Sequence, residues 1–139
     1  MQIADQYCQN GELSKALEKY KEIVEKFPCN YEAWMNLGHC FFIMKDYHSS
    51  LSAYQKVQKS NTQEINPQLW YALGLVYIKL GSYYESKHCL SFALKISPNF
   101  QLKQKLLYKL GMVYLKLNRK QKAKHYLSLS ISDEEDRQT

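Results

Sequence analysis

Histidine and cysteine stand side by side twice in this sequence, as His39-Cys40 and His88-Cys89. Both residue types bind zinc, but a zinc site needs several ligands that point at one ion. Neighbouring side chains on a helix point about 100° apart, so neither pair chelates one ion easily if its segment is helical. The four cysteines also show no Cys-x-x-Cys spacing. We therefore expect no metal site and no cofactor, and we expect the cysteines to be small apolar fillers in a reducing compartment.

Catalytic patterns are missing as well. The sequence has no Gly-rich phosphate loop and no nucleophile elbow. Residues 132–139 contain four acidic side chains and no apolar one, so we expect this tail to be disordered rather than to form a carboxylate site. No apolar run approaches the roughly 20 residues that span a bilayer, and the first residues lack the pattern of a secretory signal. We expect a non-enzymatic chain that does not act at a membrane.

Positive charge concentrates in residues 101–132, which hold eight basic residues and no acidic one. This basic patch consists of Lys103, Lys105, Lys109, Lys116, Arg119, Lys120, Lys122 and Lys124. Such a patch can contact nucleic acid, an acidic peptide or the acidic tail, and it can also be a solvated end face. Because no aromatic–basic interleaving or recognition-helix pattern accompanies it, we do not expect nucleic acid to be read directly.

A repeated helical unit must position these side chains. The motif Trp-x-x-Leu-Gly-x-x-Tyr at 70–77 recurs in altered form at 34–41 and 107–114, and a degenerate copy occupies 3–7. Its glycine position falls at residues 4, 38, 74 and 111, which gives steps of 34, 36 and 37 residues. Self-similarity at this period predicts a solenoid of helical hairpins and is the pattern of the tetratricopeptide repeat, or TPR.

Each hairpin should pack around its glycine, where the backbone of the second helix can approach closely. Twelve positions later a small residue is expected on the second helix, and a bulky one four residues after that. The small residues are Ala16, Ser50, Ser86 and Ala123, and the bulky ones are Tyr20, Tyr54, Leu90 and Leu127. Pro28 and Pro98 close two of the repeats. The predicted fold class is all-α, a right-handed α-solenoid.

The predicted repeats are 1–30, 31–66, 67–100 and 101–131, followed by the tail 132–139. Their helices are expected at about 2–9, 12–27, 30–43, 47–60, 67–80, 83–96, 100–117 and 119–131. Asn30 and Asn66 are expected N-caps, with Pro67 at the first helical position, and Asn99 should cap the long helix that follows it. Asn118 suits a helix C-cap. The short first repeat is either a capping repeat or a truncated boundary.

The first helices of stacked hairpins line a concave groove in a solenoid of this kind. Apolar residues there that the hairpins do not need would suit a partner helix or an extended peptide with spaced anchors. The predicted groove consists of Met35, Asn36, His39, Phe42, Tyr71, Leu75, Ile78, Tyr108, Lys109, Met112 and Leu115. Some of these side chains could instead lean into neighbouring repeats and stay dry.

One known use of TPR grooves is not expected. Co-chaperone TPR domains hold a C-terminal carboxylate with lysine, asparagine and arginine at fixed positions. Asn36 matches in one frame of the repeats, while Lys105 and Lys109 match in the next, but the remaining clamp positions do not match in either frame.

The stretch from Asn66 to Leu127 resembles two eukaryotic families more closely, in its Asn-Pro before Trp70, its Ser97-Pro98-Asn99-Phe100 and the 37-residue step to Gly111. These are the TPR subunit of the fungal general transcriptional corepressor and the TPR half of the UTX-type histone demethylases. The resemblance implies a nuclear adaptor whose first repeats bind helices of a WD-repeat corepressor subunit. The alternative is a TPR adaptor of another assembly, such as a ciliary transport, anaphase-promoting or protein-import complex, with a cytoplasmic location. Homo-oligomerisation through the terminal repeats stays open.

Overall fold

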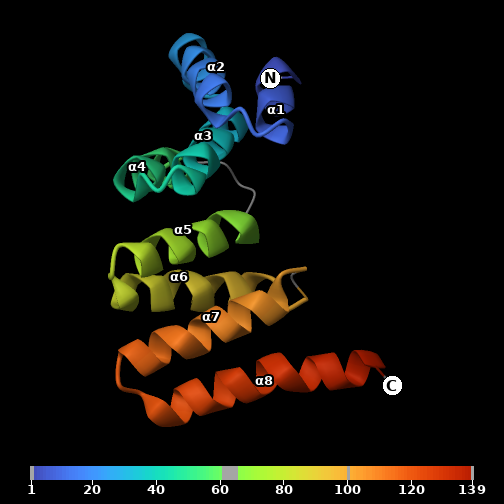
Figure 1. Ribbon diagram of the computed structural model, residues 1–139. Coiled ribbons are helices and arrows are strands. Elements are labelled where there is room, and N and C mark those ends of the chain that lie inside the picture. The colour runs from blue at the N-terminus through green and yellow to red at the C-terminus, as the bar shows by residue number, and fades with distance from the viewer. Residues whose placement is uncertain (1, 61–65, 100, 139) are drawn as a thin grey trace. The chain divides into compact units, whose positions relative to one another are not determined.

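The computed structural model describes the backbone of residues 2–60, 66–99 and 101–138. Every regular element in these ranges is an α-helix, as predicted, and successive helices pair as hairpins (Figure 1). The helices are α1 (Gln2–Gln9), α2 (Leu13–Lys26), α3 (Tyr31–Ile43), α4 (Tyr47–Gln58), α5 (Pro67–Lys79), α6 (Tyr83–Ile96), α7 (Lys103–Lys116) and α8 (Lys120–Gln138). None of the described helices is long and apolar enough to cross a membrane.

The chain forms two compact units. Unit 1 comprises Met1–Gln63 with α1 to α4, and unit 2 comprises Glu64–Thr139 with α5 to α8. Within unit 1, α2 also packs against α3, and within unit 2, α6 packs against α7. The predicted loop between the units lies largely outside the described residues. The predicted groove has residues in both units, with Met35, Asn36, His39 and Phe42 in unit 1 and the others in unit 2.

Small residues let the two helices of a hairpin come together, as predicted. Ala16, Ser50, Ser86 and Ala123 are all completely buried. The Ser50 hydroxyl donates a hydrogen bond to the carbonyl of Gly38 at 2.7 Å, and the Ser86 hydroxyl donates one to the carbonyl of Gly74 at 2.8 Å.

The bulky side chain of the second helix fills most of the space above each helical glycine. A Cβ atom at Gly74 would lie 2.5 Å from Leu90 Cδ2, and one at Gly38 would lie 2.7 Å from the ring of Tyr54. At Gly111 a Cβ atom would also lie 3.3 Å from the backbone oxygen of Ala123, so the expected close approach of the second helix's backbone is found there. The bulky residue of the second helix inserts where the glycine lacks a side chain, and both Tyr54 and Leu90 are buried there.

Each hairpin turn contains one residue in the left-handed region, with φ between 59° and 77°. These residues are Gly11, Lys45, Gly81 and Asn118. The amide after each of them donates to a carbonyl five residues back, as in Ser82 N to Tyr77 O at 2.9 Å and Arg119 N to Tyr114 O at 2.8 Å. This is the Schellman type of helix ending, which satisfies carbonyls left free at the helix end. The expected role of Asn118 at the end of α7 is confirmed.

The beginnings of two helices agree with their predicted caps. The side chain of Asn30 accepts a hydrogen bond from Ala33 N, and that of Asn66 accepts one from Gln68 N, with Pro67 at the first turn of α5. The fourth repeat differs, since α7 begins at Lys103 rather than at 100, and its N-cap residue is Leu102 rather than Asn99. Leu102 packs against the core of unit 2, which places the turn there. The expected long helix is therefore not formed, since α7 has 14 residues and α5 has 13, and residues 97–102 connect α6 to α7.

The last helix differs from its prediction too. The described backbone of α8 is helical up to Gln138, whereas the sequence predicted a disordered tail from 132. Residues 119–138 contain neither proline nor glycine, so nothing in the chain forces the helix to end at 131.

Each unit has its own buried cluster of apolar side chains. In unit 1 the cluster includes Ala4, Tyr20, Leu37 and Cys40, and the Tyr20 hydroxyl donates a hydrogen bond to Asp5. Burial in this cluster raises the pKa of the Cys40 thiol to about 12. The expectation of cysteines as apolar fillers holds for Cys40 and Cys89, which are buried, and Cys8 is half-buried. It is wrong for Cys29, which is exposed because it follows Pro28 in the connection between α2 and α3.

Candidate functional site

The part of the predicted groove in unit 1 lies on α3. Met35, Asn36 and Phe42 are half-buried there, and His39 is exposed. The ring of Phe42 meets that of Tyr47 at the start of α4 edge to face, with centroids 5.4 Å apart. This aromatic side chain therefore already contributes to its own hairpin.

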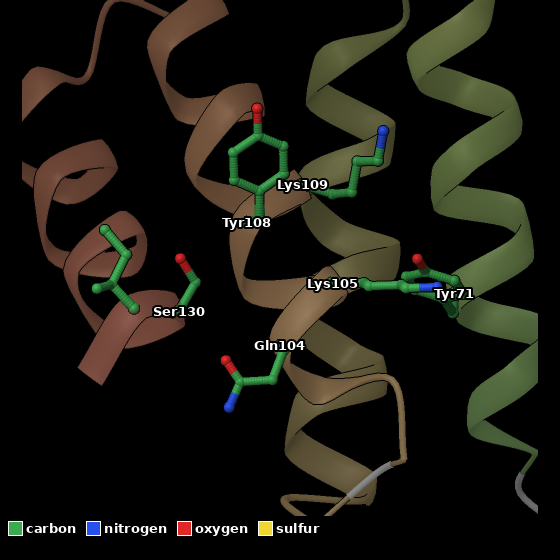
Figure 2. A pocket seen from close by; sticks show the side chains of 7 residues that line it. Tyr71, Gln104, Lys105, Tyr108, Lys109 and Ser130 are labelled. Carbon is green, nitrogen blue, oxygen red and sulfur yellow. The ribbon is translucent and has the colours of Figure 1, made fainter. Parts of the chain in front are cut away.

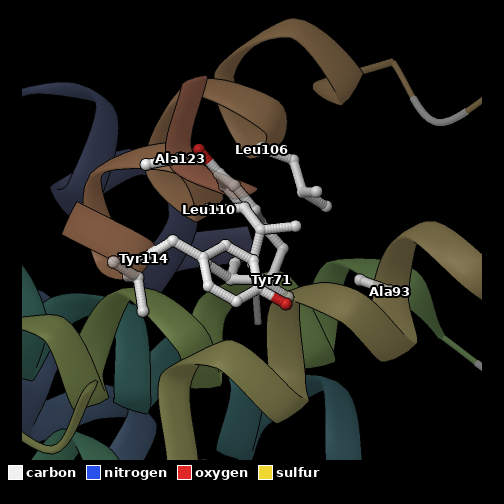
Figure 3. Packing of buried hydrophobic residues seen from close by; sticks show 8 residues of the cluster. Tyr71, Ala93, Leu106, Leu110, Tyr114 and Ala123 are labelled. Atoms are coloured by element: carbon white, nitrogen blue, oxygen red, sulfur yellow. The ribbon is translucent and has the colours of Figure 1, made fainter. Parts of the chain in front are cut away.

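In unit 2 the residues predicted on α5 belong mainly to the core. Tyr71 is only 9% exposed and lies in one buried cluster with Leu106 and Leu110 of α7 (Figure 3). Leu75 and Ile78 pack against the same cluster. The expectation that packing does not need these residues is wrong for Tyr71, which is buried in one cluster with residues of α7, while Leu75 and Ile78 are half-buried against that cluster. Burial also raises the pKa of the Tyr71 hydroxyl.

The residues predicted on α7 remain at the surface. Tyr108, Met112 and Leu115 are exposed large apolar side chains, and Lys109 is half-buried beside them. Among the predicted groove residues of unit 2, those on α7 are thus accessible to a partner and those on α5 are largely covered.

A pocket of about 360 Å³ opens over α7. Figure 2 shows Lys105 reaching from α7 toward Tyr71, while Ser130 of α8 lies on the other side of α7. The lining residues are Tyr71, Gln104, Lys105, Tyr108, Lys109, Ser130 and Ile131. Neither lysine forms an ion pair with another described side chain, and no acidic residue lines the pocket, so it is cationic and partly aromatic.

Sequence reasoning missed three of these residues as parts of a groove, namely Gln104, Ser130 and Ile131. The Oε1 atom of Gln104 is buried and has no hydrogen-bond partner among the described residues. A buried amide oxygen without a partner costs free energy, so it favours a donor that arrives with a ligand. The 37-residue step was the available signal for the other two, because Ser130 and Ile131 correspond to Ala93 and Leu94, which pack in the core.

The basic patch divides between two places on the last hairpin. Lys105 and Lys109 line the pocket near the start of α7, whereas Lys116, Arg119, Lys120, Lys122 and Lys124 are exposed around the turn to α8. Lys103 is half-buried. The Nζ atom of Lys122 lies 5.6 Å from the ring centre of Tyr114. An α-helix rises about 1.5 Å per residue, so α7 separates the two groups by roughly 15 Å.

The histidine–cysteine pairs do not converge. In each pair the histidine is exposed and the cysteine is buried. Within the part of the chain that the structure describes, no group of three or more histidine, cysteine, aspartate or glutamate side chains could hold a metal ion.

Comparison with known protein families gives matches along most of the chain. One tetratricopeptide repeat model matches residues 1–40, and a second matches 31–64, 67–100 and 104–132. These ranges overlap every hairpin described above, and α8 continues past the last of them.

Two curated relatives are general transcriptional corepressors. The chain is 33% identical over 100 residues to corepressor trfA of Dictyostelium discoideum and 30% identical over 101 residues to corepressor ssn6 of Schizosaccharomyces pombe. These regions are 72% and 73% of this chain but only 7% and 9% of the relatives, so the chain corresponds to a small part of each relative.

Solved structures show the same fold. The chain resembles MamA from Desulfovibrio magneticus RS-1 with a TM-score of 0.88 at 16% identity, over 99% of this chain and 75% of that one. This likeness confirms the predicted fold class. With its repeat matches and its helical hairpins, the chain belongs to the tetratricopeptide repeat family.

Proposed function

We propose that this chain is a non-enzymatic interaction scaffold of a nuclear transcriptional corepressor, which holds a helical or extended segment of a partner protein. A WD-repeat corepressor subunit is the partner class to test first. The similarity to two corepressors over nearly three quarters of the chain supports the corepressor part of this proposal.

The single structural observation that carries the binding role is the exposed face of α7 with its pocket. Tyr108, Met112 and Leu115 are large apolar side chains at the surface of a helix whose equivalent in the preceding hairpin is covered. Soluble proteins rarely leave several such side chains together without a use, and partner binding is the usual one. Lys105 and Lys109 beside them add attraction for an acidic segment.

Co-purification tests the proposal directly. The tagged chain should recover a WD-repeat corepressor subunit from nuclear extract, and the double variant Tyr108→Ala, Met112→Ala should lose most of it. Tyr84→Ala is the matched control, because Tyr84 is an exposed tyrosine on α6. Equal recovery by the wild type and the double variant would remove α7 from the interface.

Localisation separates the corepressor from the alternative adaptor. A fluorescently tagged chain should accumulate in nuclei. Its exclusion from nuclei would favour a TPR adaptor of another assembly, and the experiment does not depend on which surface binds the partner.

A further inference from the structure

The last two hairpins place equivalent residues in different surroundings. Residues 37 positions apart correspond, as Gly74 corresponds to Gly111. Tyr71 is 9% exposed and its equivalent Tyr108 is 50% exposed. The same contrast holds for three further pairs, in which the first residue packs against the core of unit 2 and the second is exposed. These pairs are Leu75 and Met112, Ile78 and Leu115, and Leu94 and Ile131.

The contrast follows from what packs on the earlier hairpin. Helix α7 brings Leu106 and Leu110 into the buried cluster around Tyr71, and Leu75, Ile78 and Leu94 pack against this cluster. No helix among the described residues covers the later set, so Met112, Leu115 and Ile131 are 37%, 42% and 60% exposed. We call Tyr108, Met112, Leu115 and Ile131 the end face.

The earlier hairpin therefore shows what fits on the end face. The element that packs on Tyr71 is the helix α7, which presents Leu106 and Leu110, four residues apart, to the cluster that Leu75 and Ile78 also pack against. Tyr108, Met112 and Leu115 have the same spacing along α7 as Tyr71, Leu75 and Ile78 have along α5. They extend over about 10 Å of the helix, a length that two turns of a crossing helix can cover. No extended segment among the described residues packs on the earlier hairpin in this way, so the comparison favours a helix.

The positive charge beside these residues indicates which kind of helix would bind there. Lys105 and Lys109 lie beside Tyr108 in the pocket, and residues 101–132 include eight basic side chains and no acidic one. A second copy of α7, with lysine at 103, 105, 109 and 116, would bring like charges onto this surface. A helix with acidic residues beside its apolar stripe would meet complementary charge. The unpartnered Gln104 Oε1 in the same pocket offers an acceptor for a donor side chain of that helix.

We propose that the end face binds an acidic amphipathic helix of a partner protein, which takes the place that α7 takes on the preceding hairpin. This inference rests on the proposed scaffold function and names the chemistry and the binding mode of its partner. The partner helix presents leucine-like residues four positions apart to Tyr108 and Met112, with carboxylates directed at Lys105 and Lys109.

A peptide derived from α7 itself provides the probe. It has the sequence of residues 102–117 with glutamate in place of Lys103, Lys105, Lys109 and Lys116. The comparison peptide keeps the four lysines and therefore has the same apolar side chains. Binding to the full chain is measured by isothermal titration calorimetry at two salt concentrations.

We expect the acidic peptide to bind one site with a dissociation constant on the order of 10 to 100 μM, because a single short helix must be ordered on binding. The lysine peptide should bind at least tenfold more weakly. Raising the salt from 50 to 500 mM should weaken the acidic peptide severalfold, because salt screens the lysines.

Variants of the chain locate the site. Tyr108→Ala with Met112→Ala should weaken the acidic peptide at least tenfold, whereas the exposed control Tyr84→Ala should leave it unchanged. Lys105→Glu with Lys109→Glu should reverse the preference between the two peptides, whereas Lys120→Glu with Lys124→Glu, which changes the charge equally at the turn to α8, should preserve it. Circular dichroism confirms that each variant keeps its helices.

Equal binding of both peptides, no binding of either, or binding that the Tyr108 and Met112 variant leaves intact would each overturn this inference. So would a dimer of the chain, detected by analytical ultracentrifugation, that Tyr108→Ala dissociates, because the end face would then bind a second copy. Failure of the peptide leaves the proposed function standing if the WD-repeat subunit still co-purifies. Failure of that co-purification with the peptide still bound removes the corepressor role instead.

Discussion

Ser86 Oγ donates a 2.8 Å hydrogen bond to the carbonyl of Gly74, twelve residues earlier in the same hairpin. Ser50 and Gly38 form the same bond one repeat before. In the first and last hairpins the equivalent residues are Ala16 and Ala123, which are equally buried but have no hydroxyl. Small size is thus the shared requirement of this position, and the hydroxyl adds a bond where it is present.

Replacement of Ser86 separates the two contributions. Ser86→Ala should lower the free energy of unfolding by less than about 1 kcal/mol, because the Gly74 carbonyl keeps its place in the hydrogen bonding of α5 and alanine suits a helix. Ser86→Val should cost about 1–3 kcal/mol, because the helix contact leaves no room for two methyl groups. Urea denaturation followed by circular dichroism measures both. A larger loss for alanine than for valine would contradict this view.

The glycine beside each bulky residue gives a second test. In Gly38→Ala the new Cβ atom would lie 2.7 to 3.0 Å from three ring atoms of the buried Tyr54. We expect a net loss of about 1–2 kcal/mol, since overpacking exceeds the gain of roughly 1 kcal/mol in helix propensity. In a Tyr54→Ala background the same change should become neutral or stabilising. A double-mutant cycle measures this coupling, and simple additivity of the two changes would disprove the contact.

Lys45 occupies a turn position where two other hairpins have glycine. Its φ of 66° is unfavourable for a residue with a side chain, and the equivalent residues Gly11 and Gly81 have φ of 76° and 77°. Lys45→Gly should therefore raise the free energy of unfolding by about 1 kcal/mol. Asn118→Gly should gain less, because asparagine tolerates this conformation better than lysine. A thermal midpoint that falls in Lys45→Gly would show that the lysine side chain stabilises the turn in another way.

The sequence predicted the hairpins well because their determinants are local and repeated. The glycine, the small residue twelve positions later and the asparagine caps all act within one hairpin, so their spacing alone specifies the contact. The beginning of α7 was missed because it depends on Leu102 packing against a neighbouring helix, which the pattern of one repeat does not contain.

The candidate site was harder to predict for the same reason. Tyr71 and Tyr108 hold the same repeat position, and the sequence assigned both to a groove. Their difference arises from the helix that stacks on the first and not on the second. Ser130 and Ile131 lie within the predicted helix 119–131, but they were missed as site residues because the repeat pattern gives no role to positions after the bulky residue of the second helix.

Truncation of the two tyrosines should make this difference measurable. Tyr71→Ala removes a buried ring from the core of unit 2 and should cost about 3–4 kcal/mol. Tyr108→Ala removes a half-exposed ring and should cost less than about 1 kcal/mol. Denaturation of each variant measures the contrast, and similar losses would mean that both rings are packed in solution.

Alkaline pH should destabilise unit 1 through Tyr54. Burial raises the pKa of its hydroxyl from 10.0 to about 12, so the folded chain keeps a proton that the unfolded chain loses. The contribution of Tyr54 is complete below pH 10 and falls as the pH rises to about 12, by roughly 2–3 kcal/mol in total. Tyr54→Phe should remove this loss.

The relevant measurement is the free energy of unfolding of the wild type and of Tyr54→Phe between pH 9 and 12. The difference between them should move in favour of the variant as the pH rises. Tyr84→Phe, at the surface of α6, serves as the control and should follow the wild type. Parallel curves for the wild type and Tyr54→Phe would exclude Tyr54 as a source of the alkaline loss.

The left-handed turn residues have a wider consequence for how such a chain can change in length. Each lies seven residues after the glycine position, at 11, 45, 81 and 118 against 4, 38, 74 and 111. All variation among the steps of 34, 36 and 37 residues therefore falls outside the segment from a glycine position to the following turn. Insertions there leave every turn intact, whereas one residue added inside a turn would rotate the second helix by about 100° and bury the wrong side chains. Arrays of this kind can thus gain or lose connecting residues without changing the unit that folds.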